Sequence, residues 1–297
     1  MTVLRMVVAV LLLVAVCRAE SQPPAAPPRA QVEAALVKPQ AVTNKLCLVL
    51  LADKKDHKVN EHDYPLWQER WALLLGGKAA SEAKQVNLFG DAIAGANTTD
   101  GAEQVEVLRA TSWPTAEQFA KANVIIAFCY LPWTAERKQE LRRYLERGGG
   151  LVLIHSATWT KPKADPEVAA LVGVGGFTRW RHGELKINLT ATDHPICRGL
   201  LKQMTFCDEP YWPPTPPPTA GRVTALAVSQ EDDAAQPIFW TTETGRGRVF
   251  GCVPGHYVWT FDDPWFRLLL LRGIAWAAGG DVFRLDPLAL RGARVAD

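Results

Sequence analysis

Several side chains that can transfer protons or bind metal ions follow short apolar runs of the sequence. His155 follows the apolar run of GGGLVLIHSATW, and His256 follows that of GRVFGCVPGH. His57, His62 and Asp63 lie in the polar loop after the run LCLVLLA. Short apolar runs bounded by turn residues are typical of buried strands, and the loops at one edge of a parallel sheet converge on ligands. We therefore expect these residues to face one pocket.

Two adjacent acidic residues, Asp208 and Glu209, form a second candidate site for chemistry. They lie in the segment FCDEPYW, in which Tyr211 and Trp212 follow them. A carboxylate beside aromatic rings can have its pKa raised, which suits general acid or base catalysis. Aromatic rings at the edge of a site also suit stacking on a sugar ring, and Trp159 is a further candidate for this role. The alternative is that the two acidic residues only cap a loop.

The histidines are also candidates for a divalent metal site, because zinc and manganese bind imidazole and carboxylate ligands. The candidate ligands are His57, His62, His155 and His256. The spacing in HKVNEHD does not match the HExxH zinc motif, and the sequence contains no GxSxG, P-loop or GxGxxG motif. Ser156 is a candidate for substrate binding, and a Ser156–His256 nucleophile pair stays open. Each lone histidine could equally be a hydrogen-bonded structural residue.

The elements that must position these residues alternate between strands and helices from Lys45 onward, which predicts βαβ units and a parallel sheet. The predicted strands of this half are LCLVLLA, QVEVLRA, NVIIAFCY and LVLIH. The predicted helices include one with Trp67 and Trp71 on the same face, and the amphipathic segment TAERKQELRRYLERGG. After Gly173, strands alternate with loops until a closing helix in DDPWFRLLLLRGIAWAAGG. We predict one α/β domain over residues 44–281, with a mostly parallel central sheet.

The first 19 residues have the layout of a secretory signal peptide. One arginine precedes the apolar core VVAVLLLVAV, and the segment CRA supplies a small residue for cleavage. Acylation of Cys17 is the alternative, which the bulky Val16 before it disfavours. The Pro/Ala-rich residues 20–43 are predicted to be a flexible spacer, and residues 282–297 a C-terminal tail. We therefore expect an exported protein, periplasmic or extracellular.

The composition argues against several other classes of protein. Hydrophobic residues make up 48% of the chain and charged residues 22%, which is typical of a globular protein. The formal net charge is +2 without a basic block, so nucleic acid is not expected as a partner. Beyond the signal peptide, no apolar stretch is long enough to span a membrane. The cysteines show no CxxC spacing, and both a Cys197–Cys207 disulfide and the oligomeric state stay open.

The chain resembles the ThuA-like (trehalose-utilisation) family over roughly residues 45–280. The resemblance rests on the order and spacing of DHKVNEHDYPLW, GGGLVLIHSATW, DHPICRGL, FCDEPY, GRGRVFGCVPGH and FRLLLLRGIAWAAGG. It implies a flavodoxin-like, class I glutamine amidotransferase-like three-layer sandwich. In amidotransferases a nucleophilic cysteine ends the strand where LVLIHSA places His155, and His256 is similar in position to their histidine. Because that cysteine is missing here, the resemblance does not imply glutaminase activity.

The same resemblance implies an activity on sugars, especially on 3-keto-glycosides such as keto-trehalose. Proton abstraction beside the ketone, followed by loss of the glycosidic oxygen, needs a base and an acid. His155 and His256 would supply them, with Glu209 or Asp208 as their partner. The loop DHKVNEHD would close the pocket or hold a divalent metal ion that polarises the ketone.

Three further functions stay open, because fold does not determine function. One is a sugar-binding module without turnover on an amidotransferase-like scaffold. Another is a metal-dependent hydrolase of a different small substrate. The third is a structural or partner-binding role, which only the Pro-rich loop 213–218 supports.

Overall fold

The computed structural model describes residues 21–93, 96–97, 99–219 and 223–297. The predicted signal peptide and Cys17, the candidate site of acylation, lie outside the described residues. Within the described part of the chain, none of the helices has the length and apolar character needed to cross a membrane.

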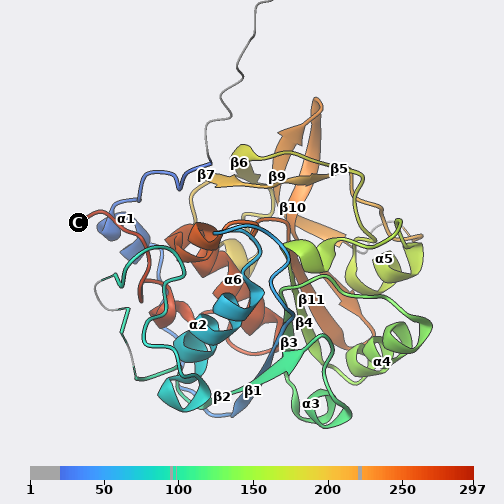
Figure 1. Ribbon diagram of the computed structural model, residues 1–297, viewed down its shortest axis with the longest axis horizontal. Coiled ribbons are helices and arrows are strands. Elements are labelled where there is room, and N and C mark those ends of the chain that lie inside the picture. Colours follow the sequence, from blue (N-terminus) through green and yellow to red (C-terminus); the bar gives the residue numbers. More distant parts are fainter. Residues whose placement is uncertain (1–20, 94–95, 98, 220–222) are drawn as a thin grey trace, which may run out of the picture.

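A nine-stranded mixed sheet forms the centre of the molecule (Figure 1). Its strand order is β2-β1-β3-β4-β11-β10-β9-β6-β7, and the first five strands in this order are parallel. These parallel strands are β1 (Leu46–Ala52), β2 (Val105–Thr111), β3 (Val124–Ala127), β4 (Gly150–Ile154) and β11 (Gly247–Cys252). The antiparallel strands are β6 (Gly183–Leu189), β7 (Gln203–Asp208), β9 (Val223–Glu231) and β10 (Ala234–Thr244). A separate two-stranded ribbon pairs β5 (Arg179–Trp180) with β8 (Tyr211–Trp212).

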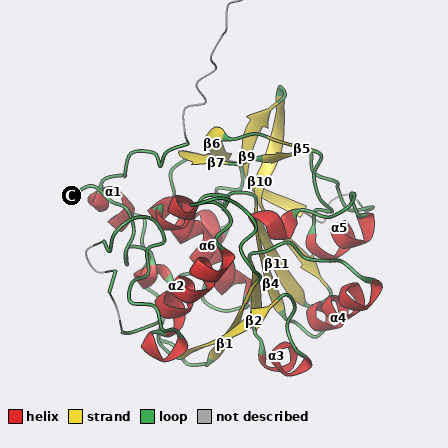
Figure 2. Cartoon of the chain, in the orientation of Figure 1, coloured by secondary structure: helices red, strands yellow, loops and turns green. Residues whose placement is uncertain are grey.

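Helices cover both faces of the parallel strands and complete a three-layer sandwich (Figure 2). One face carries α2 (Tyr64–Gly76) and α6 (Pro264–Ala277). The other face carries α3 (Ala116–Lys121), α4 (Ala135–Glu146) and α5 (Pro166–Val172). The predicted α/β class with mostly parallel central strands is therefore confirmed.

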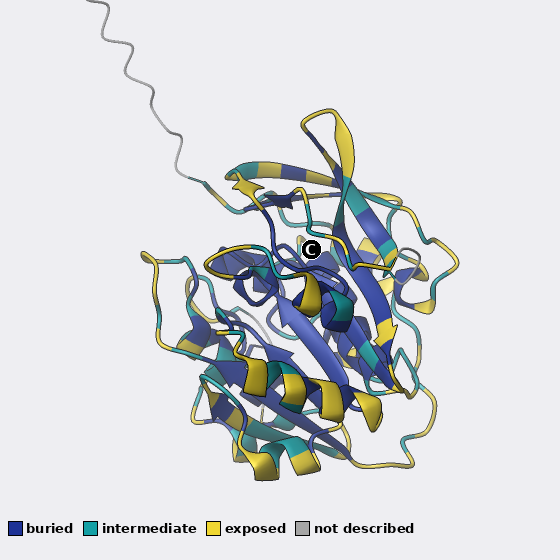
Figure 3. Cartoon of the chain, turned by 90° about the vertical axis from the view of Figure 1, so that its right-hand side faces the viewer, coloured by how far each residue is buried: buried dark blue, intermediate teal, exposed yellow. Residues whose placement is uncertain are grey.

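Local sequence explains these elements. Every residue of β1 and of β4 is buried, as expected for strands with helices on both faces (Figure 3). Trp67 and Trp71 are buried in α2 as predicted, and Asp63 begins this helix by accepting a hydrogen bond from the Leu66 amide. Asp263 caps α6 in the same way, and Pro264 occupies its first turn.

The structure differs from the predicted flexible spacer, because residues 21–43 pack against the body of the protein. This segment contains the short helix α1 (Arg29–Glu33), in which Val32 is buried. The Arg29 amide donates a hydrogen bond to the Ala296 carbonyl, so the segment lies beside the C-terminal tail (Figure 1). Proline and alanine content indicated flexibility, whereas these contacts depend on partners more than 200 residues away.

The buried side chain of Arg272 in α6 holds several of these segments together. Its guanidinium contacts both oxygens of the buried carboxylate of Asp286, at 3.0 and 2.8 Å. It also donates hydrogen bonds to the carbonyls of Ala35, Ile196 and Arg198. One cation therefore links the N-terminal segment, the loop before β7 and the C-terminal tail.

Replacing Arg272 by alanine should lower the free energy of unfolding by about 3–5 kcal/mol, since it leaves the Asp286 carboxylate buried without its counter-ion. Urea denaturation followed by circular dichroism measures this change. A matched control is Lys121→Ala, because Lys121 pairs with Glu117 at an exposed position and should not change the midpoint measurably. Equal stability of Arg272→Ala and the wild type would contradict this role.

Candidate functional site

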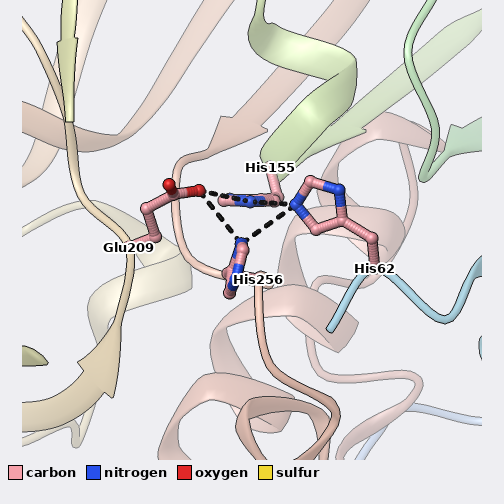
Figure 4. A group of neighbouring side chains, drawn as sticks. All are labelled: His62, His155, Glu209 and His256. Atoms are coloured by element: carbon pink, nitrogen blue, oxygen red, sulfur yellow. Dashed lines mark hydrogen bonds and ion pairs between the residues drawn. The ribbon is translucent and has the colours of Figure 1, made fainter. Parts of the chain in front are cut away.

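Four buried side chains from four separate segments meet at the carboxyl edge of the parallel strands (Figure 4). They are His62, His155, Glu209 and His256, and we call them the His–Glu cluster. His62 lies between β1 and α2, and His155 follows β4 directly. Glu209 follows β7, and His256 lies in the loop after β11. Of the residues expected to face one pocket, the structure brings His62, His155 and His256 together, and Glu209 joins them.

His155 occupies a sharp turn at the end of β4. Its φ of 49° lies in the left-handed region, which non-glycine residues seldom adopt. A short 3₁₀ helix, His155–Thr158, begins at the same residue. Such strain is retained at sites where a side chain must be presented in one direction. Here it directs the imidazole toward His62 and Glu209.

The distances within the His–Glu cluster suit a metal ion. The Nε2 atom of His62 lies 2.8 Å from Nε2 of His155 and 3.0 Å from Nδ1 of His256. Oε2 of Glu209 lies 3.2 Å from Nε2 of His155 and 3.0 Å from Nδ1 of His256. Ligands about 2.0–2.1 Å from a tetrahedral zinc ion would lie roughly 3.3 Å apart. Four of the six distances among these atoms are therefore close to that spacing, and all six lie within 4.8 Å.

Neighbouring acceptors turn the other nitrogens of these histidines outward. Nδ1 of His155 lies 2.7 Å from the Val253 carbonyl, which requires a proton on that nitrogen. Nδ1 of His62 lies 3.1 Å from Oδ1 of Asp56. Nε2 of His256 is buried without a hydrogen-bond partner among the described residues, and the carboxylate oxygen Oε2 of Glu61 is 3.8 Å away. The outer nitrogens of His155 and His62 therefore have acceptors for their protons, the arrangement that leaves the inner nitrogens of metal-binding histidines free to bind the ion.

Burial and proximity set the ionisation of the His–Glu cluster. Burial, together with the imidazoles of His155 and His256, lowers the pKa of His62 far below its usual value, so His62 is neutral. Burial opposes ionisation of Glu209, but its contacts with the same two imidazoles outweigh this and hold its pKa well below its usual range. The cluster therefore combines a neutral imidazole at His62 with a carboxylate at Glu209.

Asp208 has a different position from the one expected of a catalytic partner. Its carboxylate is fully buried and accepts hydrogen bonds from the amides of Gly255 and His256 at 3.0–3.1 Å. It also accepts hydrogen bonds from the Glu209 amide and the Thr260 hydroxyl. Because adjacent residues at a strand end point to opposite sides, Glu209 enters the cluster while Asp208 fixes the loop that carries His256.

Three other predicted residues, His57 and Asp63 in the loop after β1 and Ser156 after His155, lie outside the cluster. His57 is partly exposed, with its ring 3.7 Å from that of His62 and its Nδ1 2.8 Å from Asp56. Asp63 caps α2 and pairs with Lys55 at 3.4 Å, so it does not reach the cluster. Ser156 is buried, and its hydroxyl does not form the pair with His256 that the sequence left open.

The predicted aromatic residues Tyr211 and Trp159 lie beside the cluster. The Tyr211 hydroxyl is 2.7 Å from Nε2 of His155, and its ring stacks on that imidazole at 4.6 Å. Burial raises the pKa of Tyr211 well above its usual value, so the hydroxyl keeps its proton. The Trp159 ring lies 4.8 Å from the Tyr211 ring. Trp212 instead donates a hydrogen bond to Asp232.

Some residues that contact the cluster were not predicted from the sequence. His182 was not among the predicted site residues, yet its Nε2 lies 3.5 Å from Oε1 of Glu209 while its side chain is 40% exposed. Tyr64, Asp56 and Glu61 contact the outer nitrogens of the cluster histidines. In the sequence, only the closeness of these three residues to His62 could have indicated that they contact the cluster. The cysteines of the open disulfide question, Cys197 and Cys207, are free thiols.

The fold is a three-layer α/β sandwich of the amidotransferase-like type. At the turn after β4 this chain has a histidine, His155, and not a cysteine. The family model ThuA, described as trehalose utilisation, matches residues 67–277, so the chain belongs to the ThuA family. No curated protein matches the sequence.

Solved structures with the same fold include two ThuA-like proteins. The protein from Bacteroides uniformis is 19% identical with a TM-score of 0.58, over 83% of this chain and 99% of its own. The protein from Parabacteroides merdae is 17% identical with a TM-score of 0.53, over 80% of this chain and 92% of its own. At these identities the similarity shows the fold alone.

Proposed function

We propose that this protein is an exported enzyme that uses a divalent metal ion, Zn²⁺ or Mn²⁺, to act on a sugar ketone such as a 3-keto-glycoside. The observation that carries the proposal is the His–Glu cluster, in which three imidazole nitrogens and one carboxylate oxygen face each other. The family description, trehalose utilisation, supports a carbohydrate substrate. The apolar core and cleavage segment of the first 19 residues support export.

A metal ion accounts for the cluster better than hydrogen bonding does. The outer nitrogens of His155 and His62 face acceptors, so their neutral imidazoles have no proton for the 2.8 Å contact between their inner nitrogens. A cation between the four atoms would be attracted to all of them. Imidazole and carboxylate are ligands that zinc and manganese accept.

We assign His155, at the turn after β4, and His256, in the loop after β11, a different role from the one first expected. His155 uses one nitrogen for the Val253 carbonyl and turns the other into the cluster, so neither is available to exchange protons with a substrate. His256 also turns Nδ1 inward. Both residues therefore fit metal binding better than acid–base catalysis.

Proton transfer then falls to Glu209 and Tyr211. A bound divalent ion would act as a Lewis acid that polarises the ketone. The ionised Glu209 carboxylate can accept the proton from the carbon beside that ketone, and its Oε1 faces the partly exposed His182. The Tyr211 hydroxyl, protonated and next to His155, can donate a hydrogen bond to a developing oxyanion.

Metal removal tests this function on the purified full-length mature protein. We expect turnover of 3-keto-trehalose to fall at least about 100-fold after dialysis against a chelator, and to return on addition of Zn²⁺ or Mn²⁺. Addition of Mg²⁺ is a matched control, because Mg²⁺ prefers oxygen ligands and should restore little activity. Full activity in protein from which the metal has been removed would contradict the proposal.

A sugar-binding module is the second candidate, and a specific observation favours it. All four cluster residues are buried, and a closed set of four protein ligands is typical of structural zinc sites. In that case the metal would be retained and sugars would bind, but no keto-glycoside would be turned over.

A further inference from the structure

A partly exposed tryptophan stands near the His–Glu cluster. Among the described residues, only Val59 and Trp180 are large hydrophobic side chains with high exposure, and Trp180 is 56% exposed. Trp180 lies in β5, directly opposite Tyr211 of β8 in the two-stranded ribbon. Exposing a ring of this size to water is unfavourable, so a ligand that covers it would gain binding energy.

Stacked and edge-on rings connect Trp180 to the cluster. The Tyr211 ring stacks on His155 with an interplanar angle of 25°. Trp159 meets Tyr211 edge-on, at 4.8 Å and 76°, and it meets Trp180 edge-on, at 5.8 Å and 82°. Phe177 packs behind them, 5.5 Å from Tyr211. We call Tyr211, Trp159 and Trp180 the aromatic wall; it extends from a proposed metal ligand to the protein surface.

A charged pair lies on the opposite face of the two-stranded ribbon from Trp180. Arg179, the residue before Trp180, pairs with Asp232, and both side chains are at least half exposed. Asp232 lies at the tip of the β9–β10 hairpin, where its φ of 50° fits a tight turn. It also accepts a hydrogen bond of 2.6 Å from the indole nitrogen of Trp212. Because Arg179 and Trp180 are adjacent in β5, their side chains point to opposite faces of the ribbon, and the face that carries Trp180 and Tyr211 is apolar.

We propose that Trp180, with Trp159 beside it, forms a second sugar subsite, so that the substrate is a glycoside of at least two rings. The reacting ring lies at the His–Glu cluster, and the second ring packs its apolar face on Trp180. The position of the reacting ring rests on the proposed function. The second subsite rests on the exposure of Trp180 and on the ring contacts of the aromatic wall.

Direct binding measurements separate the two subsites without needing turnover. The probes are trehalose, maltose and cellobiose, each compared with methyl α- and β-glucopyranoside by isothermal titration calorimetry. We expect the wild type to bind at least one disaccharide about tenfold more tightly than the monosaccharides, and Trp180→Ala to remove this difference. Trp180→Phe should keep most of it, because phenylalanine retains an aromatic face. Lys121→Ala, at an exposed position of α3, is the control and should bind as the wild type does.

The result that would overturn the proposal is a wild type without any preference for a disaccharide, or a preference that survives in Trp180→Ala. Each titration is run on chelator-treated and on metal-loaded protein, with the metal content measured separately. A preference that depends on Trp180 in protein that never binds metal would support the subsite and contradict the metal-dependent enzyme. Metal binding without a preference for disaccharides would support the metal site and contradict the second sugar subsite.

Discussion

Replacing His155 by alanine is expected to reduce the affinity for Zn²⁺ and Mn²⁺ at least about 100-fold, since loss of only an outer-shell partner already costs 10–100-fold in known sites. The expectation follows from the central position of its Nε2, which lies near His62 at 2.8 Å and Glu209 at 3.2 Å. A competition titration against a chromophoric chelator measures the affinity. Because a ligand that binds only the folded state stabilises it, metal should raise the melting temperature of the wild type and not of the variant.

The matched control is His194→Ala. His194 begins the 3₁₀ helix Pro195–Cys197 and packs on Trp276, so it belongs to another part of the fold. This variant should bind metal as the wild type does. A folded His155→Ala protein with unchanged metal affinity would show that His155 is not a ligand.

Replacing Asp208 by alanine is expected to lower the free energy of unfolding by about 3–5 kcal/mol, because it leaves several buried donors without an acceptor. These donors are the amides of Glu209, Gly255 and His256 and the hydroxyl of Thr260. The loop that carries His256 would lose its attachment to the end of β7. Urea denaturation of metal-free protein measures the loss separately from any effect of metal binding.

Asp208→Asn is the graded comparison for this prediction. The asparagine side chain keeps one acceptor oxygen at nearly the same volume, so it should lose clearly less stability than alanine. Glu209→Gln is a comparison at the neighbouring residue, because the Glu209 side chain contacts His155 and His256 and does not hold the backbone of this loop. If Asp208→Ala were as stable as the wild type, the loop would not depend on this carboxylate.

Much of the fold could be predicted because it follows from local patterns. Fully apolar runs predicted the buried parallel strands β1 and β4, and the spacing of Trp67 and Trp71 predicted the buried face of α2. The packing of residues 21–43 could not be predicted in this way. It depends on Arg272 and on the C-terminal tail, which are distant in the sequence and carry no periodic signal.

The members of the site were easier to predict than their roles. His62, His155 and His256 were candidates because each follows a predicted strand, and Glu209 was a candidate because it is a carboxylate flanked by aromatic residues. The different roles of Asp208 and Glu209 depend on the side of the strand end to which each side chain points. The sequence does not give the strand register that decides this. His182 was missed because its contact with Glu209 depends on the pairing of β6 with β7.

The most direct test of the metal-dependent account is the metal content of the wild-type protein. The purified protein would be treated with a chelator, reloaded with Zn²⁺ or Mn²⁺, passed through a desalting column and measured by elemental analysis. The account predicts about one equivalent of metal per chain in the reloaded protein, as expected for a single set of convergent ligands. Substantially less than one equivalent with both metals would contradict it, and the His–Glu cluster would then have to be explained by hydrogen bonding alone.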